Sequence, residues 1–218
     1  MYYKHIEKPD LAMAVIEQFQ AMILDKTLAH GDKLPPERVL SENFNVGRST
    51  IREAMKALEI AGIIERRQGD GNYITNNVHE SIIKQVQIAF SLSNGTKQDI
   101  YDIRSLLEVY ACHKAALVAN KKSTEKLFSA LEKLSKATTE ESLIKYDMQF
   151  HYEIARIAQN KLLLTLWDSI NYLFFNILER SDAFVEEHEA IAKAIAENNP
   201  KEAVEHMKLH LEYYNGLI

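Results

Sequence analysis

The sequence predicts a mostly helical protein of two domains, in which a small N-terminal domain carries a β-hairpin and a larger C-terminal domain is all-α. Hydrophobic residues make up 46% of the 218-residue chain, which has only seven glycines and four prolines. This composition is typical of helical globular proteins. Apolar residues recur at helical spacing along most of the chain. A strand-forming pattern around a glycine-rich tip occurs once, at residues 63–75.

Three helices are predicted ahead of the hairpin, over residues 10–28, 36–43 and 49–61. We expect Gly31 to stop the first helix and the Pro35-Pro36 pair to start the second. The third helix, STIREAMKALEIAG, is expected to have Ser49 or a neighbour as its N-cap and to end at Gly62. The turn NVG would join the second helix to the third.

The segment IIERRQGDGNYIT predicts two short strands that pair around a Gln-Gly-Asp-Gly tip. Two helices with a tight turn and a hairpin behind them describe a winged helix-turn-helix, expected over residues 1–75. Residues 76–218 have no strand pattern and are expected to form an all-α antiparallel helical bundle. Its helices are predicted over residues 80–93, 97–119, 124–137, 140–159, 162–180, 184–198 and 201–215.

The net charge of −5 argues against indiscriminate binding of nucleic acid. The net charge of the whole chain does not conceal a basic N-terminal region, because residues 1–75 carry ten Lys and Arg against eleven Asp and Glu. Any contact with DNA would therefore depend on where a few basic side chains are placed.

The predicted helix-turn-helix carries several hydrogen-bond donors where such motifs meet DNA. A recognition helix presents its N-terminal residues to base edges, and phosphates accept hydrogen bonds from arginine and hydroxyl side chains. Gly69 and Gly71 would let the wing backbone approach the minor groove. The alternative is that the arginines are ordinary solvated surface residues. The candidate contacts are Arg38, Arg48, Ser49, Thr50 and Arg52.

Residues 31–74 resemble the N-terminal domain of the GntR family of bacterial transcription regulators. The resemblance rests on the runs GDKLPPERVL, VGRSTIREAMKAL and the glycines of QGDGNYI. It implies binding to a double-stranded DNA operator. The main contacts that it implies are Arg38, Arg48 and Arg52, supported by Ser49 and Thr50, with Gly69 at the wing tip.

Two residues depart from the family pattern. Gly47 stands where the family usually has Ser or Thr before the arginine, and Asp70 puts a negative charge into a wing where neutral or basic residues are common. We expect Asp70 either to weaken the contact between wing and phosphates or to restrict which operator sequence is tolerated.

In the second domain, the stretch DMQFH places Asp147 and His151 one helical turn apart on a face that is otherwise apolar. A buried ionised carboxylate needs a compensating partner, such as a hydrogen-bonded histidine, an arginine or a cation. From this pair alone, a hydrogen-bonded core pair is the simpler interpretation, and half of a metal site is the alternative.

Two later histidines also point inward. His188 shares its helical face with Ile191 and Ile195, and His210 lies near Met207. Three imidazoles and one carboxylate suit a divalent transition metal, namely Zn, Ni or Mn. Periodicity does not choose between His210 and His206, which lies one turn earlier.

Residues 98–214 resemble the ligand-binding FCD domain of the FadR subfamily of GntR regulators. The shared marks are Arg104 with Glu108, Asp147 with His151, Asn160 with Leu163, and the runs EHEAIAKAI and AVEHMKLHL. The resemblance selects His210 rather than His206. It implies that Asp147, His151, His188 and His210 hold a divalent metal, with zinc expected first. Members that bind fatty acyl-CoA lack this set, so we do not expect that ligand.

In the metal-binding branch of the family, small carboxylates such as sugar acids or hydroxy acids occupy the open coordination positions. The resemblance implies that Arg104 would pair with the carboxylate of such an effector through its planar guanidinium. The alternative for Arg104 is an exposed i,i+4 salt bridge to Glu108.

These patterns together predict a ligand-responsive transcription regulator that binds a short palindrome as a homodimer. We do not expect an enzyme, because a metal-dependent phosphohydrolase of HD type needs a contiguous His-Asp pair and the sequence has none. A metalloregulator that senses the ion itself stays open. The N-terminus lacks the apolar core of a signal peptide, no apolar run reaches membrane-spanning length, and Cys112 is the only cysteine. We therefore expect a cytoplasmic protein with no membrane segment.

Overall fold

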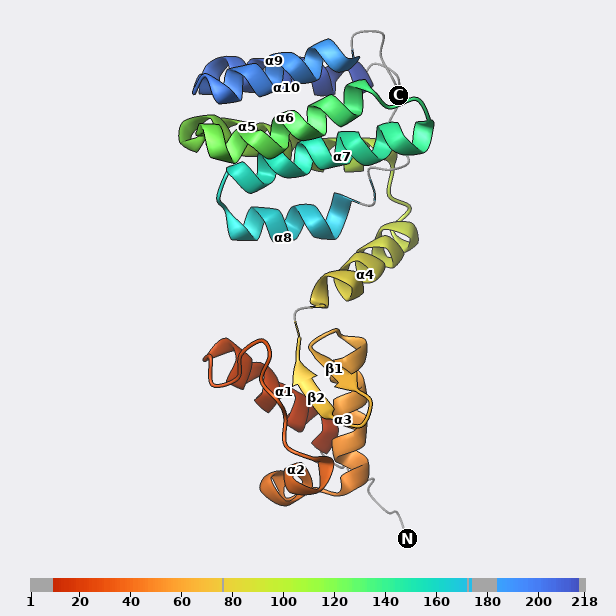
Figure 1. Cartoon of the computed structure of the whole chain (residues 1–218). Helices are drawn as coiled ribbons and strands as arrows, with labels where there is room; N and C mark the ends of the chain where they lie inside the picture. The colour runs from red at the N-terminus through yellow and green to blue at the C-terminus, as the bar shows by residue number, and fades with distance from the viewer. Residues whose placement is uncertain (1–9, 76, 172, 174–183, 216–218) are drawn as a thin grey trace. The chain divides into compact units, whose positions relative to one another are not determined.

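The computed structural model describes residues 10–75, 77–171, 173 and 184–215 (Figure 1). The chain divides into two compact units, Met1–Lys84 and Gln85–Ile218, with the division inside helix α4 (Val78–Leu92). The predicted fold class is confirmed, since a winged helix-turn-helix is followed by helices alone in the described part of the chain. None of the described helices is long and apolar enough to cross a membrane.

The N-terminal unit has three helices and an antiparallel hairpin. Its elements are α1 (Leu11–Leu24), α2 (Glu37–Phe44), α3 (Arg48–Ile60), β1 (Ile64–Arg67) and β2 (Gly71–Ile74). The strands pair in a register that sets Ile64 opposite Ile74, and both side chains are buried. Asn45 adopts the left-handed conformation that ends α2 and allows the tight turn into α3. The core of this unit contains Val15, Phe19, Leu34, Leu40, Ile51, Ala54, Met55 and Leu58.

Two predicted helix ends in this unit are wrong. Helix α1 ends at Leu24 rather than near Leu28, because the Asp25 carboxylate accepts hydrogen bonds from Thr27 and Lys26 turns left-handed. Gly31 lies beyond that end, and its N–H donates to the carbonyl of Ile74.

Helix α3 begins one residue before the predicted start. The sequence predicted Ser49 or a neighbour as the N-cap, and the N-cap is Gly47, two residues before Ser49, which provides no side-chain cap. Arg48 is consequently the first residue of the helix instead of the residue that precedes it. The end of α3 agrees with the prediction, since Gly62 follows it with a positive φ of 71°.

The C-terminal unit is a bundle whose described helices pack in antiparallel pairs. These helices are α5 (Lys97–Val118), α6 (Lys121–Ser135), α7 (Glu140–Ile157), α8 (Lys161–Ile170), α9 (Phe184–Ala196) and α10 (Pro200–Asn215). Helix α10 packs on α5 and α9, while α7 packs on α5 and α6. The helix predicted over 162–180 ends at Ile170 in the structure, and most of its remaining residues lie outside the described ones.

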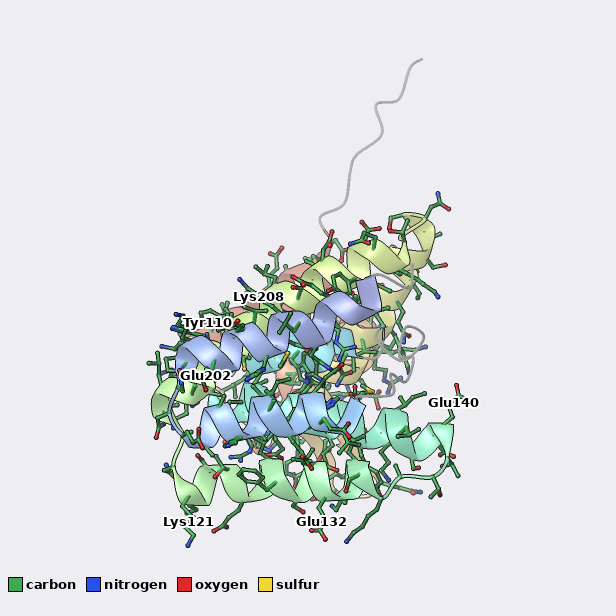
Figure 2. All side chains as sticks on the ribbon, turned by 90° about the horizontal axis from the view of Figure 1, so that it is seen from above. Tyr110, Lys121, Glu132, Glu140, Glu202 and Lys208 are labelled. Carbon is green, nitrogen blue, oxygen red and sulfur yellow. The ribbon has the colours of Figure 1, made fainter. Side chains whose placement is uncertain are left out.

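Local sequence explains why these helices start where they do. Thr96, Asn120 and Thr139 each form a capping box with the residue three positions later. Charged side chains such as Lys121 and Glu132 point away from the bundle (Figure 2). The inward faces form an apolar core that a group of buried polar residues interrupts: Arg104, Glu108, Asp147, His151, His188 and His210.

Candidate metal centre

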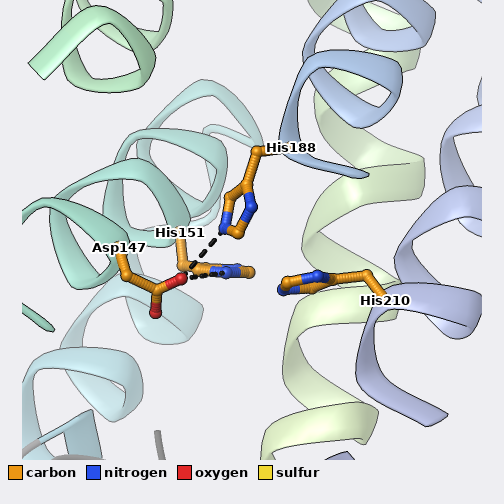
Figure 3. A group of neighbouring side chains, drawn as sticks. All are labelled: Asp147, His151, His188 and His210. Carbon is orange, nitrogen blue, oxygen red and sulfur yellow. Dashed lines mark hydrogen bonds and ion pairs between the residues drawn. The ribbon is translucent and has the colours of Figure 1, made fainter. Parts of the chain in front are cut away.

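Four side chains from three helices converge in the middle of the C-terminal unit (Figure 3). Asp147 and His151 come from α7, His188 from α9 and His210 from α10. One potential ligand atom from each residue lies within 4.8 Å of all the others. None of the four residues is more than 2% exposed. The structure therefore brings together the four residues that the sequence singled out and leaves the partly exposed His206 outside the group.

Contacts between the rings orient the three imidazoles. The His151 and His210 rings stack with centroids 5.3 Å apart, and His188 meets the His210 ring edge-on at 4.4 Å. The fully buried Phe150 ring packs edge-on against both His151 and His188. The rings therefore converge on a common centre.

Two further carboxylates lie behind the histidines. Glu108 Oε2 lies 2.7 Å from His151 Nδ1, and this ion pair lacks the geometry of a hydrogen bond. Glu187 Oε2 lies 2.8 Å from His210 Nδ1. A carboxylate at Nδ1 holds the proton on that nitrogen and leaves Nε2 as the atom available to a metal. With a metal bound, Glu108 and Glu187 would therefore keep the proton of His151 and His210 on Nδ1 and leave Nε2 to the metal.

Arg104 connects this outer layer to Asp147. Its Nε donates to Glu108 Oε1 at 2.7 Å, and its Nη2 lies 3.5 Å from Asp147 Oδ2. The i,i+4 salt bridge considered as an alternative is therefore present, but it is buried rather than exposed, since both side chains are 3% exposed. The guanidinium lies at the edge of the four-residue cluster.

Charge and burial have opposite effects on the two buried carboxyl groups. Burial raises the pKa of Asp147, but the nearby His151 and a hydrogen bond with His188 hold that pKa well below its usual value. Burial likewise raises the pKa of Glu108, and Arg104 and His151 outweigh it and lower the pKa. Both carboxylates are therefore ionised.

The pKa values of His151 and His210 are shifted in opposite directions. Burial lowers the pKa of His151, but the carboxylates of Glu108 and Asp147 outweigh burial and raise it to about 9. Burial lowers the pKa of His210, and the neighbouring His188 and His151 lower it further. At neutral pH the metal-free centre thus holds a protonated His151 beside a neutral His210.

The donor set fits a divalent transition metal. Among the described residues, His151 Nε2 and Asp147 Oδ2 are buried and have no hydrogen-bond partner. An unsatisfied buried polar atom costs about 1–3 kcal/mol, so such atoms call for a ligand. Imidazole nitrogen and carboxylate oxygen are ligands that Zn²⁺, Ni²⁺ and Mn²⁺ accept. A cation at the centre would satisfy His151 Nε2, whereas Asp147 Oδ2 faces Arg104 and Oδ1 is the oxygen that faces the imidazoles.

An apolar crevice adjoins the centre on the side of His151 and Glu108. Its remaining lining residues are Leu107, Ala111, Ile154, Ala155, Leu163, Trp167 and Met207. The crevice is too narrow to admit a water molecule. A small molecule that entered it would have to move the surrounding side chains or helices.

In the N-terminal unit, the predicted DNA contacts lie on α2, the start of α3 and the wing. Arg38, Arg48, Ser49 and Arg52 are exposed, and Thr50 is partly exposed. Gly69 lies at the wing tip with a positive φ of 76°. Carboxylates hold two of the arginines, since Arg38 pairs with Glu42 at 2.7 Å and Arg52 with Glu37 at 2.8 Å. Within the described residues Arg48 forms no ion pair.

A winged helix-turn-helix joined to a helical domain with a buried polar centre defines a ligand-responsive transcription regulator. Residues 11–74 match the family model described as bacterial regulatory proteins, gntR family, and residues 99–213 match the FCD domain. The chain therefore belongs to the GntR family and carries an FCD domain, as its sequence motifs predicted. Regulators of this family bind DNA operators, and they bind effector ligands through the FCD domain.

The relatives that resemble the chain along most of its length are transcription regulators. LutR of Bacillus subtilis is 29% identical over 203 residues, covering 87% of this chain and 93% of LutR. The Uxu operon regulator of Haemophilus influenzae is 33% identical over 195 residues, covering 84% and 72%. The solved structure of a Streptococcus agalactiae GntR protein superposes with a TM-score of 0.71 at 28% identity, covering 93% of this chain and 98% of that one.

Sequence reasoning missed the roles of two residues in the centre. Glu108 was considered only as a partner of Arg104, and Glu187 only as part of a motif. A signal for Glu108 was present, because it shares its α5 face with the buried Ala111, Cys112 and Ala115. For Glu187 the sequence holds no comparable signal, since its partner His210 lies on another helix.

We expect metal binding to release about one proton near neutral pH. His151 must lose its proton before Nε2 can bind a metal, whereas Asp147 and His210 are already deprotonated. Below the His151 pKa of about 9, the apparent affinity should therefore rise about tenfold per pH unit and then level off. Calorimetric titration with Zn²⁺ in buffers of different ionisation enthalpy measures the proton release. An affinity that does not change with pH would contradict the protonation state of His151.

We expect Glu108→Gln to weaken metal binding about 10–100-fold, because the variant removes the carboxylate at His151 Nδ1 and keeps the side-chain shape. Glu187→Gln tests the same effect at His210. The matched control is Glu132→Gln, which removes an exposed carboxylate paired with Lys136 in the same unit. Competition with a chromophoric chelator measures the affinity, and circular dichroism reports folding. Unchanged affinity in both folded variants would show that the outer carboxylates do not support the centre.

Proposed function

We propose that the chain is a metal-dependent transcription regulator whose affinity for operator DNA responds to a small carboxylate. Residues 1–75 form the DNA-binding domain and residues 76–218 the metal-binding and effector-binding domain. The observation that carries the proposal is the convergence of Asp147, His151, His188 and His210 in a chain that also holds a winged helix-turn-helix. The protein has no catalytic role in this proposal, in keeping with relatives that are named as regulators.

Asp147, His151, His188 and His210 would hold the metal, with Zn²⁺ proposed first and Ni²⁺ or Mn²⁺ as alternatives. When bound, the ion supplies a positive centre that accepts further oxygen ligands. The protein's own residues do the rest. Glu108 and Glu187 orient the imidazoles, and the apolar crevice beside His151 keeps water away from them.

Arg104 would bind the carboxylate of the effector. Its guanidinium is fully buried, faces Asp147 and is anchored by Glu108, so one edge is held in place for recognition of a planar oxyanion. A sugar acid or a hydroxy acid combines a carboxylate for Arg104 with oxygens for the metal. This chemistry favours such acids over purely apolar ligands.

Effector binding would be coupled to DNA binding through helix movement. Because the crevice beside the centre is closed even to water, an effector that enters it would bind a conformation in which the surrounding side chains or helices have moved. An effector with different affinities for two conformations shifts the balance between them. In a homodimer on a short palindrome, this shift would change how two DNA-binding domains engage two half-sites. The site of action is the cytoplasm, where the operator DNA is found.

Mass spectrometry of small molecules released from the purified protein, together with elemental analysis, would identify the effector and the metal. The functional test is operator affinity with metal alone and with metal plus candidate acids. We expect the acids to change affinity at constant metal concentration. If metal alone switches DNA binding, the protein is instead a metalloregulator that senses the ion.

We expect His210→Ala to lose both the metal and the response to acids, because it removes one of four ligands. The matched control is His206→Ala, one turn earlier on α10 and outside the cluster, which should keep both. Elemental analysis and fluorescence anisotropy with operator DNA measure the two properties. Loss of metal in both variants would contradict the ligand assignment.

We expect Arg48→Ala to weaken operator binding by about 1–3 kcal/mol, because a long donor at the start of a recognition helix contacts base edges. The control Lys136→Ala removes an exposed cation from the other unit. An operator selected from a random duplex library serves as the ligand. Normal binding by folded Arg48→Ala would remove Arg48 from the set of contacts.

A further inference from the structure

The wing tip carries an anion that two donors of the same unit hold in place. Asp70 lies between Gly69 and Gly71, and its two carboxylate oxygens are bound separately. Oδ1 is 2.6 Å from Lys33 Nζ, and Oδ2 accepts a hydrogen bond from the Tyr73 hydroxyl at 2.7 Å. Both hydrogen bonds lower the pKa of Asp70, so the carboxylate is ionised.

Contacts with the hairpin place the residues around Asp70. The backbones of Lys33 and Tyr73 form a β-bridge. The Arg67 guanidinium lies 4.0 Å from the centroid of the Tyr73 ring, and Lys33 Nζ lies 5.5 Å from it. A Cβ on Gly71 would lie 3.2 Å from Lys33 Cε, so the glycine permits the close approach of the lysine. Lys33 Nζ and the Tyr73 hydroxyl thus form an oxyanion site, and the Arg67 guanidinium, which pairs with Glu65, lies beside it on the Tyr73 ring.

We propose that Lys33 and Tyr73, with Arg67 beside them, form a binding site for a DNA backbone phosphate, and that the Asp70 carboxylate occupies this site in the free protein. The inference rests on the proposed DNA-binding role of the N-terminal domain. A phosphodiester, like a carboxylate, offers two oxygens to ammonium, guanidinium and hydroxyl donors. The donors that hold Asp70 therefore suit the oxygens of a phosphate.

The exchange of carboxylate for phosphate is energetically accessible. The side chains of Lys33 and Asp70 are 52% and 49% exposed, and such a solvated ion pair contributes little to stability. When the phosphate binds, counterions condensed on the DNA are released. Binding of the Asp70 carboxylate releases none, so counterion release favours the phosphate. Gly69 and Gly71 both have positive φ, so the residues flanking Asp70 have the backbone freedom to let it move aside. Asp70 therefore attenuates the contact between wing and DNA without abolishing it.

Asp70→Asn tests the proposal because it removes the charge and keeps the shape. Binding to a labelled duplex of arbitrary sequence is measured by anisotropy over a range of salt concentrations. We expect the affinity to rise about two- to fivefold, the equivalent of an exposed ion pair. The slope of log affinity against log salt should steepen by less than about 0.9, the value for one additional phosphate contact, because the wild-type chain already makes part of this contact. Glu59→Gln is the control, since it removes an exposed carboxylate near the far end of α3.

A double-mutant cycle shows whether the effect acts through the proposed site. In a Lys33→Gln background, Asp70→Asn should no longer raise affinity, because the phosphate has lost its main donor. Three outcomes overturn the proposal: a lower affinity in Asp70→Asn, a gain no larger than in Glu59→Gln, or a gain that persists without Lys33. Failure of the wild-type chain to bind any DNA would instead overturn the proposed function. Thermal unfolding of each variant confirms that it is folded.

Discussion

The structure of the C-terminal domain depends on the burial of the Asp147 carboxylate. Removing an ionised carboxylate from water costs several kcal/mol unless nearby charges and hydrogen bonds compensate. In this domain the compensation comes from three helices, through Arg104 on α5, His151 on α7 and His188 on α9. The polar group therefore ties together elements that apolar packing alone would allow to shift. It also leaves the buried His151 Nε2 without a hydrogen-bond partner, and a cation at the centre would satisfy that atom.

The same arrangement explains how one buried site can serve regulation. An outer layer of Glu108 and Glu187 fixes the imidazoles, while Arg104 joins that layer to the centre. Because the site touches α5, α7, α9 and α10, a ligand that changes its geometry acts on most of the bundle at once. Closely packed helices respond to such a change by moving as units.

The N-terminal unit differs from the C-terminal unit, because its paired charged side chains are exposed and their positive and negative charges nearly balance. Glu37, Glu42 and Asp70 each hold a basic side chain of the predicted DNA-binding face. A surface of this kind attracts DNA weakly at long range and depends on close contacts instead. Asp70, which departs from the family pattern, pairs with Lys33 and accepts a hydrogen bond from Tyr73.

The sequence by itself determined the fold class, the helix-turn-helix, the hairpin and the inward-facing Asp147, His151 and His188, because periodicity, capping and turn residues act over a few neighbouring positions. The sequence did not predict the end of α1, where contacts of Asp25 end the helix. It also did not predict the start of α3, where Gly47 provides no side-chain cap. Periodicity alone could not choose between His206 and His210. That choice depends on which face of α10 packs against α5 and α9, and helix packing brings His210 to the centre. Only the tertiary structure pairs Glu108 with His151 and Glu187 with His210, because each pair joins different helices and no spacing rule links them.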